Sequence, residues 1–278
     1  MTSSIDYVAY LGPSGTFSEL MARKRFGNQV ERMPFPGIYE VFEYVRAHRN
    51  GVGIVPIENS SGGTIYETID CLVEARQPLV IHEELSLQVR LALLGHRGEK
   101  IHTLYSHFAP MQHCDPWIRK HLPRVERKET ASTALAAETA STNRHAAALG
   151  MREAAKRYGL DVLEFPVQPE VPNVTQFVCI GHRRPAAVKR GKTSLIVTLH
   201  NRPGSLCEFL EVFRDYQVNM TRLLSRPIIG RPKSYVFFID IEGTAASPSV
   251  RQALNKARGI AESLREAGTY PVRRPYLS

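Results

Sequence analysis

The sequence predicts an α/β protein with two α/β lobes followed by a smaller ferredoxin-like module. Between Tyr7 and Glu74, short apolar strands alternate with helical patterns, which is typical of a layer with mostly parallel strands. A basic, proline-containing segment then interrupts the apolar pattern at 182–192, and the order β-α-β-β-α-β follows it. With 278 residues, 43% hydrophobic and 23% charged, the chain is long enough for two domains with sizeable cores.

The stretch Gly51–Glu74 joins an apolar strand to a helix through the polar turn Glu-Asn-Ser-Ser-Gly-Gly at 58–63. Thr64 and Glu67 have the spacing of a capping box, which predicts a helix start there. Free backbone N–H groups, the positive end of a helix dipole and hydroxyls would meet in this turn, so we expect it to hold an anion. An ordinary strand-to-helix loop is the alternative.

The first strand, at 7–11, leads into a junction of the same design. Thr16 and Glu19 repeat the capping-box spacing, and a further helix is expected at 38–48. Since ligands bind at the carboxyl ends of parallel strands, we expect both junctions to face one crevice.

The remaining elements follow from periodicity and turn residues. We expect strands at 79–85, 86–94, 146–150 and 177–181, and helices at 110–121, 134–141 and 153–158, the last with Gly159 as its C-cap. Beyond a boundary near 185, we expect strands at 194–199, 218–224, 235–241 and 270–274, with helices starting at 203–205 and covering 249–267.

Composition excludes several classes of protein. The formal charge of +9 suits an anionic small substrate, and no nucleic-acid-binding motif accompanies it. The four cysteines are far apart without a C-x-x-C pair, which argues against a zinc site and a disulfide framework. Neither a secretory signal nor an apolar run of membrane-spanning length is present, so we expect a cytoplasmic enzyme or regulatory protein.

Several short motifs occur in a specific order along the chain. They are Leu11-Gly-Pro-Ser-Gly-Thr-Phe-Ser18, Pro56-Ile-Glu-Asn-Ser-Ser-Gly-Gly63, Tyr105-Ser-His107 with Cys114, Ser132-Thr133, Ala147-Ala-Leu-Gly150, Tyr158-Gly-Leu160 and Asn173-x-Thr175-x-Phe177. Together they resemble, along nearly the whole chain, prephenate dehydratases that carry a C-terminal ACT domain. The resemblance implies a two-lobed, periplasmic-binding-protein-like catalytic domain at 1–185, with lobe one at about 1–82 and 170–185 and lobe two at 83–169. An ACT regulatory domain would occupy 186–278.

The family converts prephenate to phenylpyruvate, with loss of CO2 and water, in phenylalanine biosynthesis. Such a reaction implies a dicarboxylate substrate, no cofactor and no metal, because aromatisation drives it and the protein mainly orients the substrate in a dry cleft. The resemblance also implies L-phenylalanine as the effector and a homodimer or homotetramer.

Site residues are carried over from the family's motifs. Thr175 would polarise the leaving hydroxyl, and Asn59, Glu58 and His113 would complete the catalytic set. The residues implied in substrate binding are Ser60, Thr16, Ser106, Ser132, Thr133, Gln176 and Phe177. For Thr175, the alternative is a strand threonine that bonds only to backbone.

Two positions depart from the family's pattern. Gln176 replaces an arginine, which removes a bidentate cation. His113 replaces a glutamine, and it would act as a neutral donor, as a titrating cation or only as a surface histidine. These changes leave arogenate dehydration, or decarboxylation of prephenate without aromatisation, as alternatives.

The effector site is implied in the C-terminal module. Its residues are Asn201, Pro203, Gly204, Ser205, Leu206, Leu224, Ser225, Arg226 and Pro227. Leu224 stands where the family has a glutamate, which removes an acceptor for an effector's ammonium group. A catalytically silent ligand-binding regulator built on the same lobes is a further alternative.

Overall fold

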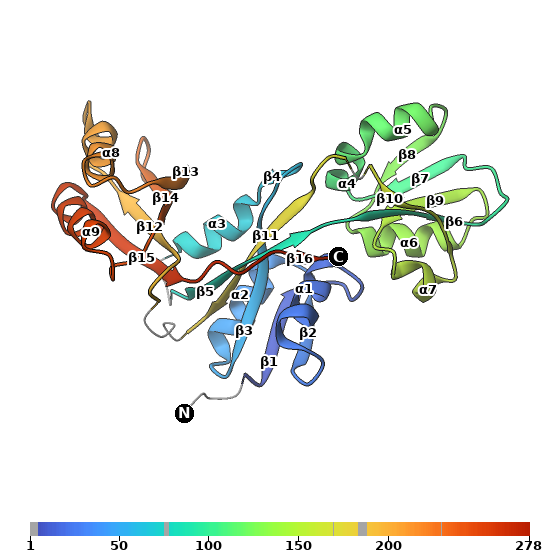
Figure 1. Ribbon diagram of the computed structural model, residues 1–278, viewed down its shortest axis with the longest axis horizontal. Coiled ribbons are helices and arrows are strands. Elements are labelled where there is room, and N and C mark those ends of the chain that lie inside the picture. Colours follow the sequence, from blue (N-terminus) through green and yellow to red (C-terminus); the bar gives the residue numbers. More distant parts are fainter. Residues whose placement is uncertain (1–4, 75–77, 169, 183–187, 229) are drawn as a thin grey trace.

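The computed structural model describes residues 5–74, 78–168, 170–182, 188–228 and 230–278. These residues form three separate sheets, one for each lobe and one for the C-terminal module. Figure 1 shows the first lobe in the middle, the second lobe at one end and the C-terminal module at the other. The boundary expected near 185 lies outside the described residues.

The first lobe is built on a mixed sheet with the strand order β16-β5-β11-β3-β1-β2 and β4 beside β3. Its strands are β1 (Tyr7–Leu11), β2 (Glu31–Phe35), β3 (Gly51–Asn59), β4 (Gly63–Thr64), β5 (Val80–Gln88), β11 (Val174–Gly181) and β16 (Tyr276–Leu277). Its helices are α1 (Phe17–Phe26), α2 (Ile38–Ala47) and α3 (Tyr66–Val73). β1 pairs parallel with β2 and β3, whereas β11 runs antiparallel to β3 and β5, so the parallel order expected from the alternation covers only part of this sheet.

The second lobe is built on the sheet β10-β6-β9-β7-β8. Its strands are β6 (Leu91–Gly95), β7 (Thr103–Ser106), β8 (Glu126–Glu129), β9 (Ala146–Gly150) and β10 (Asp161–Val167), and its helices are α4 (Phe108–His113), α5 (Asp115–His121), α6 (Thr133–Ser141) and α7 (Ala154–Tyr158). Gly159 ends α7 with a positive φ of 67°, as expected for a C-cap. The helix expected at 110–121 is divided at Cys114 into α4 and α5.

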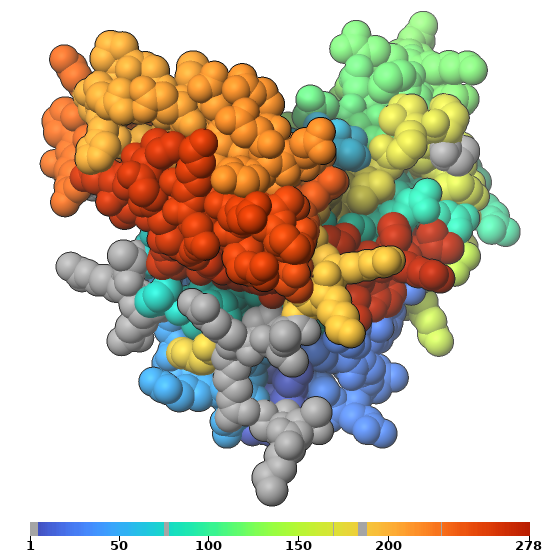
Figure 2. Space-filling model, turned by 60° about the vertical axis from the view of Figure 1, so that its left-hand side comes forward, coloured from blue at the N-terminus to red at the C-terminus, as the bar shows by residue number. Residues whose placement is uncertain are grey.

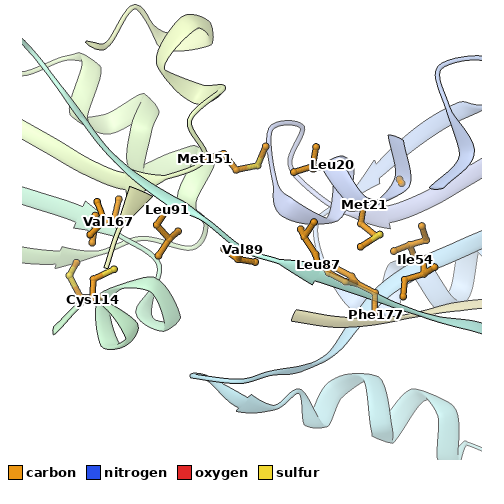
Figure 3. Close-up of a cluster of buried hydrophobic side chains, with 14 of the residues drawn as sticks. Leu20, Met21, Ile54, Leu87, Val89, Leu91, Cys114, Met151, Val167 and Phe177 are labelled. Carbon is orange, nitrogen blue, oxygen red and sulfur yellow. The ribbon is translucent and has the colours of Figure 1, made fainter. Parts of the chain in front are cut away.

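The two lobes share one apolar core along the chain crossing between them. Leu87, Val89 and Leu91 continue the buried cluster from the first lobe into the second. Figure 3 shows these side chains in line, with Met151 of the second lobe near Leu20 of the first. β5 lies entirely in the first sheet, so the chain crosses at Val89 and Arg90, a few residues beyond the expected 82–83.

The C-terminal module has the predicted order β-α-β-β-α-β. It consists of β12 (Lys192–Thr198), α8 (Ser205–Asp215), β13 (Met220–Pro227), β14 (Tyr235–Glu242), α9 (Pro248–Ile260) and β15 (Ser263–Tyr270), with the sheet order β13-β14-β12-β15. The helix expected at 249–267 was too long, because 263–267 pair with β12 as part of β15. The last strand of the module, which the sequence placed at 270–274, is β15 and covers Ser263–Tyr270 instead.

The chain's C-terminal residues return to the first lobe. Backbone bonds join Arg273 to Glu84 and Ser278 to Gln88, and β16 pairs parallel with β5. Residues 271–278 therefore lie along the first sheet and not on the module's own sheet, a placement that the sequence pattern does not predict. In Figure 2 the orange and red module rests on the blue first lobe, and the green second lobe stands apart from it.

The capping boxes had different outcomes. Thr16 accepts a hydrogen bond from the Glu19 N–H at 3.4 Å and begins α1 as predicted. The prediction for Thr64 was wrong, because Thr64 belongs to β4 and α3 begins after Ile65 without a side-chain cap. The described helices include none long and apolar enough to cross a membrane.

Candidate active site

A cavity of about 230 Å³ lies where the two lobes meet. The first lobe contributes residues from the ends of β1, β3 and β11 and the start of α1, and the second lobe contributes the starts of α4 and α6. Its polar lining residues are Thr16, Ser18, Asn59, His107, Ser132, Thr133, Asn173 and Thr175, and Phe177 is among the apolar ones.

Asn59 and Thr175 are paired directly across β3 and β11. The Asn59 Nδ2 group donates to Thr175 Oγ1 at 2.8 Å and to Asn173 Oδ1 at 2.9 Å. Asn59 Oδ1 accepts from the N–H groups of Ser61 and Gly62 at 2.9 and 2.8 Å. Since Thr175 Oγ1 accepts from Asn59, its own hydrogen remains available for a donor bond into the cavity.

The polar turn after β3 is a hairpin between β3 and β4, and it is not the start of a helix. Its backbone N–H groups are engaged inside the protein, because Ser60 donates to Val174 O and both Ser61 and Gly62 donate to Asn59. The expected anion site at this turn is therefore not formed. The turn fixes Asn59 instead.

The N-termini of α1 and α6 both reach the cavity. Thr16 caps α1, and Ser132 caps α6 by accepting from the Leu135 N–H at 3.1 Å. Both capping residues line the cavity, one from each lobe. Helix N-termini carry partial positive charge and unpaired N–H groups, so this arrangement suits a ligand with carboxylates at its two ends.

The cavity lining contains no carboxylate and no Lys or Arg among the described residues. Its titratable side chain is His107, whose pKa is lowered by burial, with an opposing contribution from Glu129. The lining therefore relies on helix dipoles, hydroxyls and amides for polarity.

His113, Ser60 and Ser106 do not line this cavity. His113 is buried, with 7% exposure, and its Nδ1 lies 2.8 Å from Ser61 Oγ. Burial lowers its pKa, which favours the neutral donor over the titrating cation and excludes the surface histidine. Ser60 ties the hairpin to β11 through Val174 N, and Ser106 donates to Leu149 O inside the second lobe.

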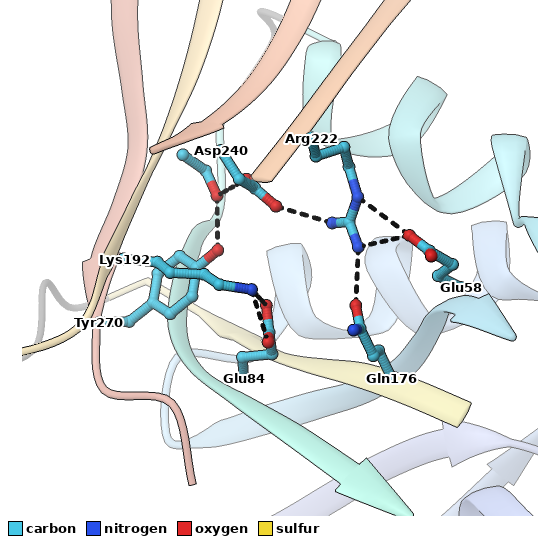
Figure 4. A network of polar contacts seen from close by, with 8 residues as sticks. Glu58, Glu84, Gln176, Lys192, Arg222, Asp240 and Tyr270 are labelled. Carbon is cyan, nitrogen blue, oxygen red and sulfur yellow. Dashed lines mark hydrogen bonds and ion pairs between the residues drawn. The ribbon is translucent and has the colours of Figure 1, made fainter. Parts of the chain in front are cut away.

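Glu58 and Gln176 point away from the cavity. Successive strand residues face opposite sides, so these neighbours of Asn59 and Thr175 face the C-terminal module. Arg222 of β13 donates to Glu58 Oε2 and to Gln176 Oε1, both at 2.8 Å, as Figure 4 shows. Gln176, expected to bind substrate, is therefore hydrogen-bonded to Arg222, and Glu58, expected to be catalytic, forms an interdomain ion pair with it.

The residues expected to bind the effector lie at one end of the module's sheet. Ser225 and Pro227 are exposed there, whereas Leu224 and Arg226 face the first lobe. β12 and β13 both pair antiparallel with β14, where Thr198 and Arg226 are each opposite Val236. The loop that starts α8, with Asn201, Pro203, Gly204, Ser205 and Leu206, is therefore at the same end as Ser225 and Pro227, which are exposed.

Leu224 and Arg226 face the first lobe. Leu224 packs against a buried cluster that the first lobe and the module share. Arg226 forms two 2.6 Å bonds to Asp70 of α3 and lies over the Tyr66 ring. In this structure Arg226 joins the module to α3.

Comparison with known proteins identifies the family and the fold. The prephenate dehydratase family model matches residues 8–185, about two thirds of the chain. The chain belongs to the prephenate dehydratase family. The ACT domain family model matches residues 193–259, so the C-terminal module is an ACT module.

Curated relatives and solved structures agree with this family. The bifunctional chorismate mutase/prephenate dehydratase of Stutzerimonas stutzeri is 36% identical over 267 residues, which cover 95% of this chain and 73% of that protein. The crystal structure of an Arthrobacter aurescens prephenate dehydratase in complex with L-Phe has a TM-score of 0.84 and 29% identity, covering 95% of this chain and 90% of that one. GqqA, described as a novel type of quorum quenching acylase, has a TM-score of 0.83 and 25% identity, covering 96% of this chain and 98% of that one. The predicted fold class is confirmed.

Sequence reasoning missed four polar residues that the structure places at or beside the cavity. Asn173 accepts from Asn59, Ser18 and His107 line the cavity, and Ser61 contacts His113. All four belong to motifs that carry the resemblance, so membership of a motif was the available signal. Their individual contacts depend on how β3 meets β11 and on how the lobes meet.

Proposed function

We propose that the protein is a prephenate dehydratase that acts at the Asn59–Thr175 end of the interlobe cavity. The observation that carries the proposal is the Thr175 hydroxyl, which accepts from Asn59 at 2.8 Å and lines the cavity. Family membership and the two helix N-termini that face the cavity support it.

The chemistry is a coupled loss of two groups from the ring. As the ring carboxylate leaves as CO2, its bonding electrons enter the ring and expel the hydroxyl group opposite, which takes up one proton and leaves as water. Thr175 donates a hydrogen bond to the departing oxygen, where negative charge develops. The N-termini of α1 and α6 hold the carboxylates, and enclosure between the lobes limits competing water.

The cavity lining favours prephenate over arogenate. Arogenate carries an ammonium group in place of prephenate's keto group, and a buried cation is costly unless a carboxylate pairs with it. Among the described lining residues no side chain is acidic. The retained Thr175 hydroxyl supports dehydration over decarboxylation without aromatisation.

The regulatory proposals rest on the ACT module. We assign the catalytic domain to residues 1–185 and the ACT domain to 186–270, with 271–278 returning to the catalytic sheet. We infer a cytoplasmic homodimer or homotetramer in which L-phenylalanine binds between ACT modules, at the loop 201–206 and the exposed Ser225–Pro227 end of β13. The likeness to the L-Phe complex supports this assignment.

Incubation of the purified protein with prephenate, followed by mass identification of the product, tests the function. We expect phenylpyruvate, and we expect Thr175→Ala to lose nearly all rate. Arogenate serves as the competing substrate. If calorimetry showed prephenate or phenylalanine binding without any turnover, the protein would be a ligand-binding regulator.

Acyl hydrolysis is a second candidate. It is favoured by the likeness to GqqA and by the 2.8 Å contact between Ser61 Oγ and buried, neutral His113, which resembles a nucleophile and its base. It is disfavoured because the Ser61 and Gly62 N–H groups, the nearest oxyanion donors, are bonded to Asn59. Release of fatty acid from an N-acyl amide, abolished by Ser61→Ala, would establish this activity.

A further inference from the structure

We propose that Arg222 of the ACT module is a positioning residue for dehydration. Its guanidinium joins Glu58 to Gln176 and thereby holds the adjacent pair Asn59 and Thr175 in place. This inference deepens the proposed function and rests on it for its catalytic consequence.

The Arg222 guanidinium spans three acceptors in two domains. Nη2 donates to Glu58 Oε2 and to Gln176 Oε1 at 2.8 Å, Nε donates to Glu58 Oε2 at 3.2 Å, and Nη1 donates to Asp240 Oδ2 at 2.8 Å. The Arg222 side chain is only 7% exposed. A planar cation with a fixed fork of donors is suited to this bridging, whereas a single ammonium group is not.

Arg222 bridges β3 and β11 beside an irregularity in their pairing. Gln176 is opposite Glu58, and the next pair is Thr175 and Asn59, but the register shifts between Gln176 and Phe177. A bulge there interrupts the ladder between β3 and β11, whereas β11 keeps its pairing with β5 and β3 its pairing with β4. Side-chain contacts that bridge β3 and β11 therefore support their alignment at this position. Ser60 ties the outer end of these pairs to β11, and Arg222 ties the end next to the bulge.

Arg222 is itself held rigidly from the ACT side. Asp240, whose side chain is 1% exposed, accepts from Arg222 and from Ser194 Oγ, and Ser194 also contacts the buried Tyr270 hydroxyl. Figure 4 shows this line of contacts beside the ion pair between Lys192 and Glu84. Through Arg222, the position of Asp240 in the ACT sheet is coupled to the positions of Glu58 on β3 and Gln176 on β11.

Gln176 supplies an uncharged acceptor to Arg222. The resemblance places an arginine at this position of the family's motif, and glutamine cannot donate to a carboxylate as a charged fork. In this chain Gln176 accepts from Arg222 instead. Exchanging the two residues should return the guanidinium to β11 and preserve the tie to Glu58.

The test compares interface variants by steady-state kinetics with prephenate. Since a small misplacement of catalytic groups can cost about 10²-fold in rate, we expect Arg222→Met to lower kcat roughly ten- to hundredfold while changing KM less than about threefold. Gln176→Met, which leaves the Arg222–Asp240 pair intact, should give a smaller fall. The double exchange Gln176→Arg with Arg222→Gln should recover most of kcat.

Arg265→Met is the matched control. Arg265 joins the same two domains by donating to Leu72 O and Val73 O of α3, without contacting Glu58 or Gln176. We expect its kcat to stay close to that of the original chain. Equal losses in Arg222→Met and Arg265→Met would show that Arg222 only docks the domains.

Hydrogen exchange gives a readout that does not need turnover. Arg222→Met should speed exchange in 56–62 and 173–178 relative to the original chain, and Arg265→Met should not. If the original chain did not convert prephenate, the proposed function would be wrong, but the structural role of Arg222 would still be tested by hydrogen exchange. If Arg222→Met did not change the hydrogen-exchange rates of 56–62 and 173–178, the positioning role would be wrong.

Discussion

Asn59 uses the full hydrogen-bonding capacity of its side-chain amide. Its two N–H groups are donated to Asn173 and Thr175, and its oxygen accepts from Ser61 and Gly62. A saturated amide of this kind has little capacity left for substrate. These contacts indicate that Asn59 fixes the Thr175 hydroxyl and the hairpin, which remains a prediction for the function of the site.

Asn59→Asp and Asn59→Ala should separate these two roles. The aspartate keeps an acceptor for the Ser61 and Gly62 N–H groups but cannot donate to Thr175, so we expect near-normal stability and a large loss of kcat. The alanine also leaves those N–H groups unpaired, which should cost a further 1–3 kcal/mol or so. Urea denaturation and prephenate turnover measure both effects. Equal stability of the two variants would contradict the hairpin role.

His113→Gln should reduce the acid sensitivity of the fold. Burial lowers the His113 pKa below its usual value, so the folded state resists protonation and its contribution to stability is lost as the pH falls below about 6.5. Glutamine does not titrate. We expect the difference in unfolding free energy between pH 8 and pH 5 to be smaller in the variant, with His107 accounting for part of the remainder. An unchanged difference would show that His113 does not contribute.

At the scale of elements, α1 and α6 would supply the positive charge for the carboxylates of the proposed substrate. Each starts at a capping residue in the cavity, and the two come from different lobes. The partial positive charge at these N-termini is sensitive to any negative side chain placed beside it.

Ser132→Asp should leave the protein folded and weaken substrate binding. Aspartate is as good an N-cap as serine, so stability should hold, whereas Ser132→Ala should cost about 1 kcal/mol. The aspartate carboxylate would repel the substrate's carboxylate, so we expect KM to rise at least tenfold. Ser132→Ala should change KM much less. A KM for Ser132→Asp no higher than that of Ser132→Ala would contradict α6 as a carboxylate site.

At the scale of the whole molecule, the ACT module contacts the catalytic domain at α3 and at the ends of β3 and β11. Arg226 binds Asp70, Arg265 binds the C-terminal end of α3, and Arg222 binds Glu58. The C-terminal residues add a strand to β5, and Arg90, at the crossing between the lobes, donates its N–H to Ser278 Oγ at 2.7 Å. Movement of the module would therefore reach α3, the ends of β3 and β11, and the crossing.

Asp70→Asn should weaken phenylalanine inhibition and leave basal turnover nearly unchanged. Asp70 lies on α3, away from the cavity lining, and holds Arg226 beside the proposed effector end of β13. Coupling between sites is typically about 1–3 kcal/mol, so we expect the half-inhibiting phenylalanine concentration to change at least fivefold. Inhibition curves with prephenate measure this. An unchanged concentration would exclude the Arg226–Asp70 contact as part of the coupling.

The sequence by itself determined the fold class, the order of the ACT elements and most of the helix starts. Local patterns are sufficient for these features, because apolar periodicity and capping depend only on residues that are close together in the sequence. Thr16 was identified as a helix-start residue in this way, and it lines the cavity together with Ser132, which the structure shows to cap α6.

Only the tertiary structure decided which side each motif residue faces. Asn59 and Thr175 face the cavity while Glu58 and Gln176 face Arg222, because neighbouring strand residues point to opposite sides and the partners of both faces come from distant parts of the chain. The strand at 263–267 and the C-terminal strand likewise depend on pairing with β12 and β5. Such long-range pairing leaves no local signal, since it is set by the energy of packing whole elements together.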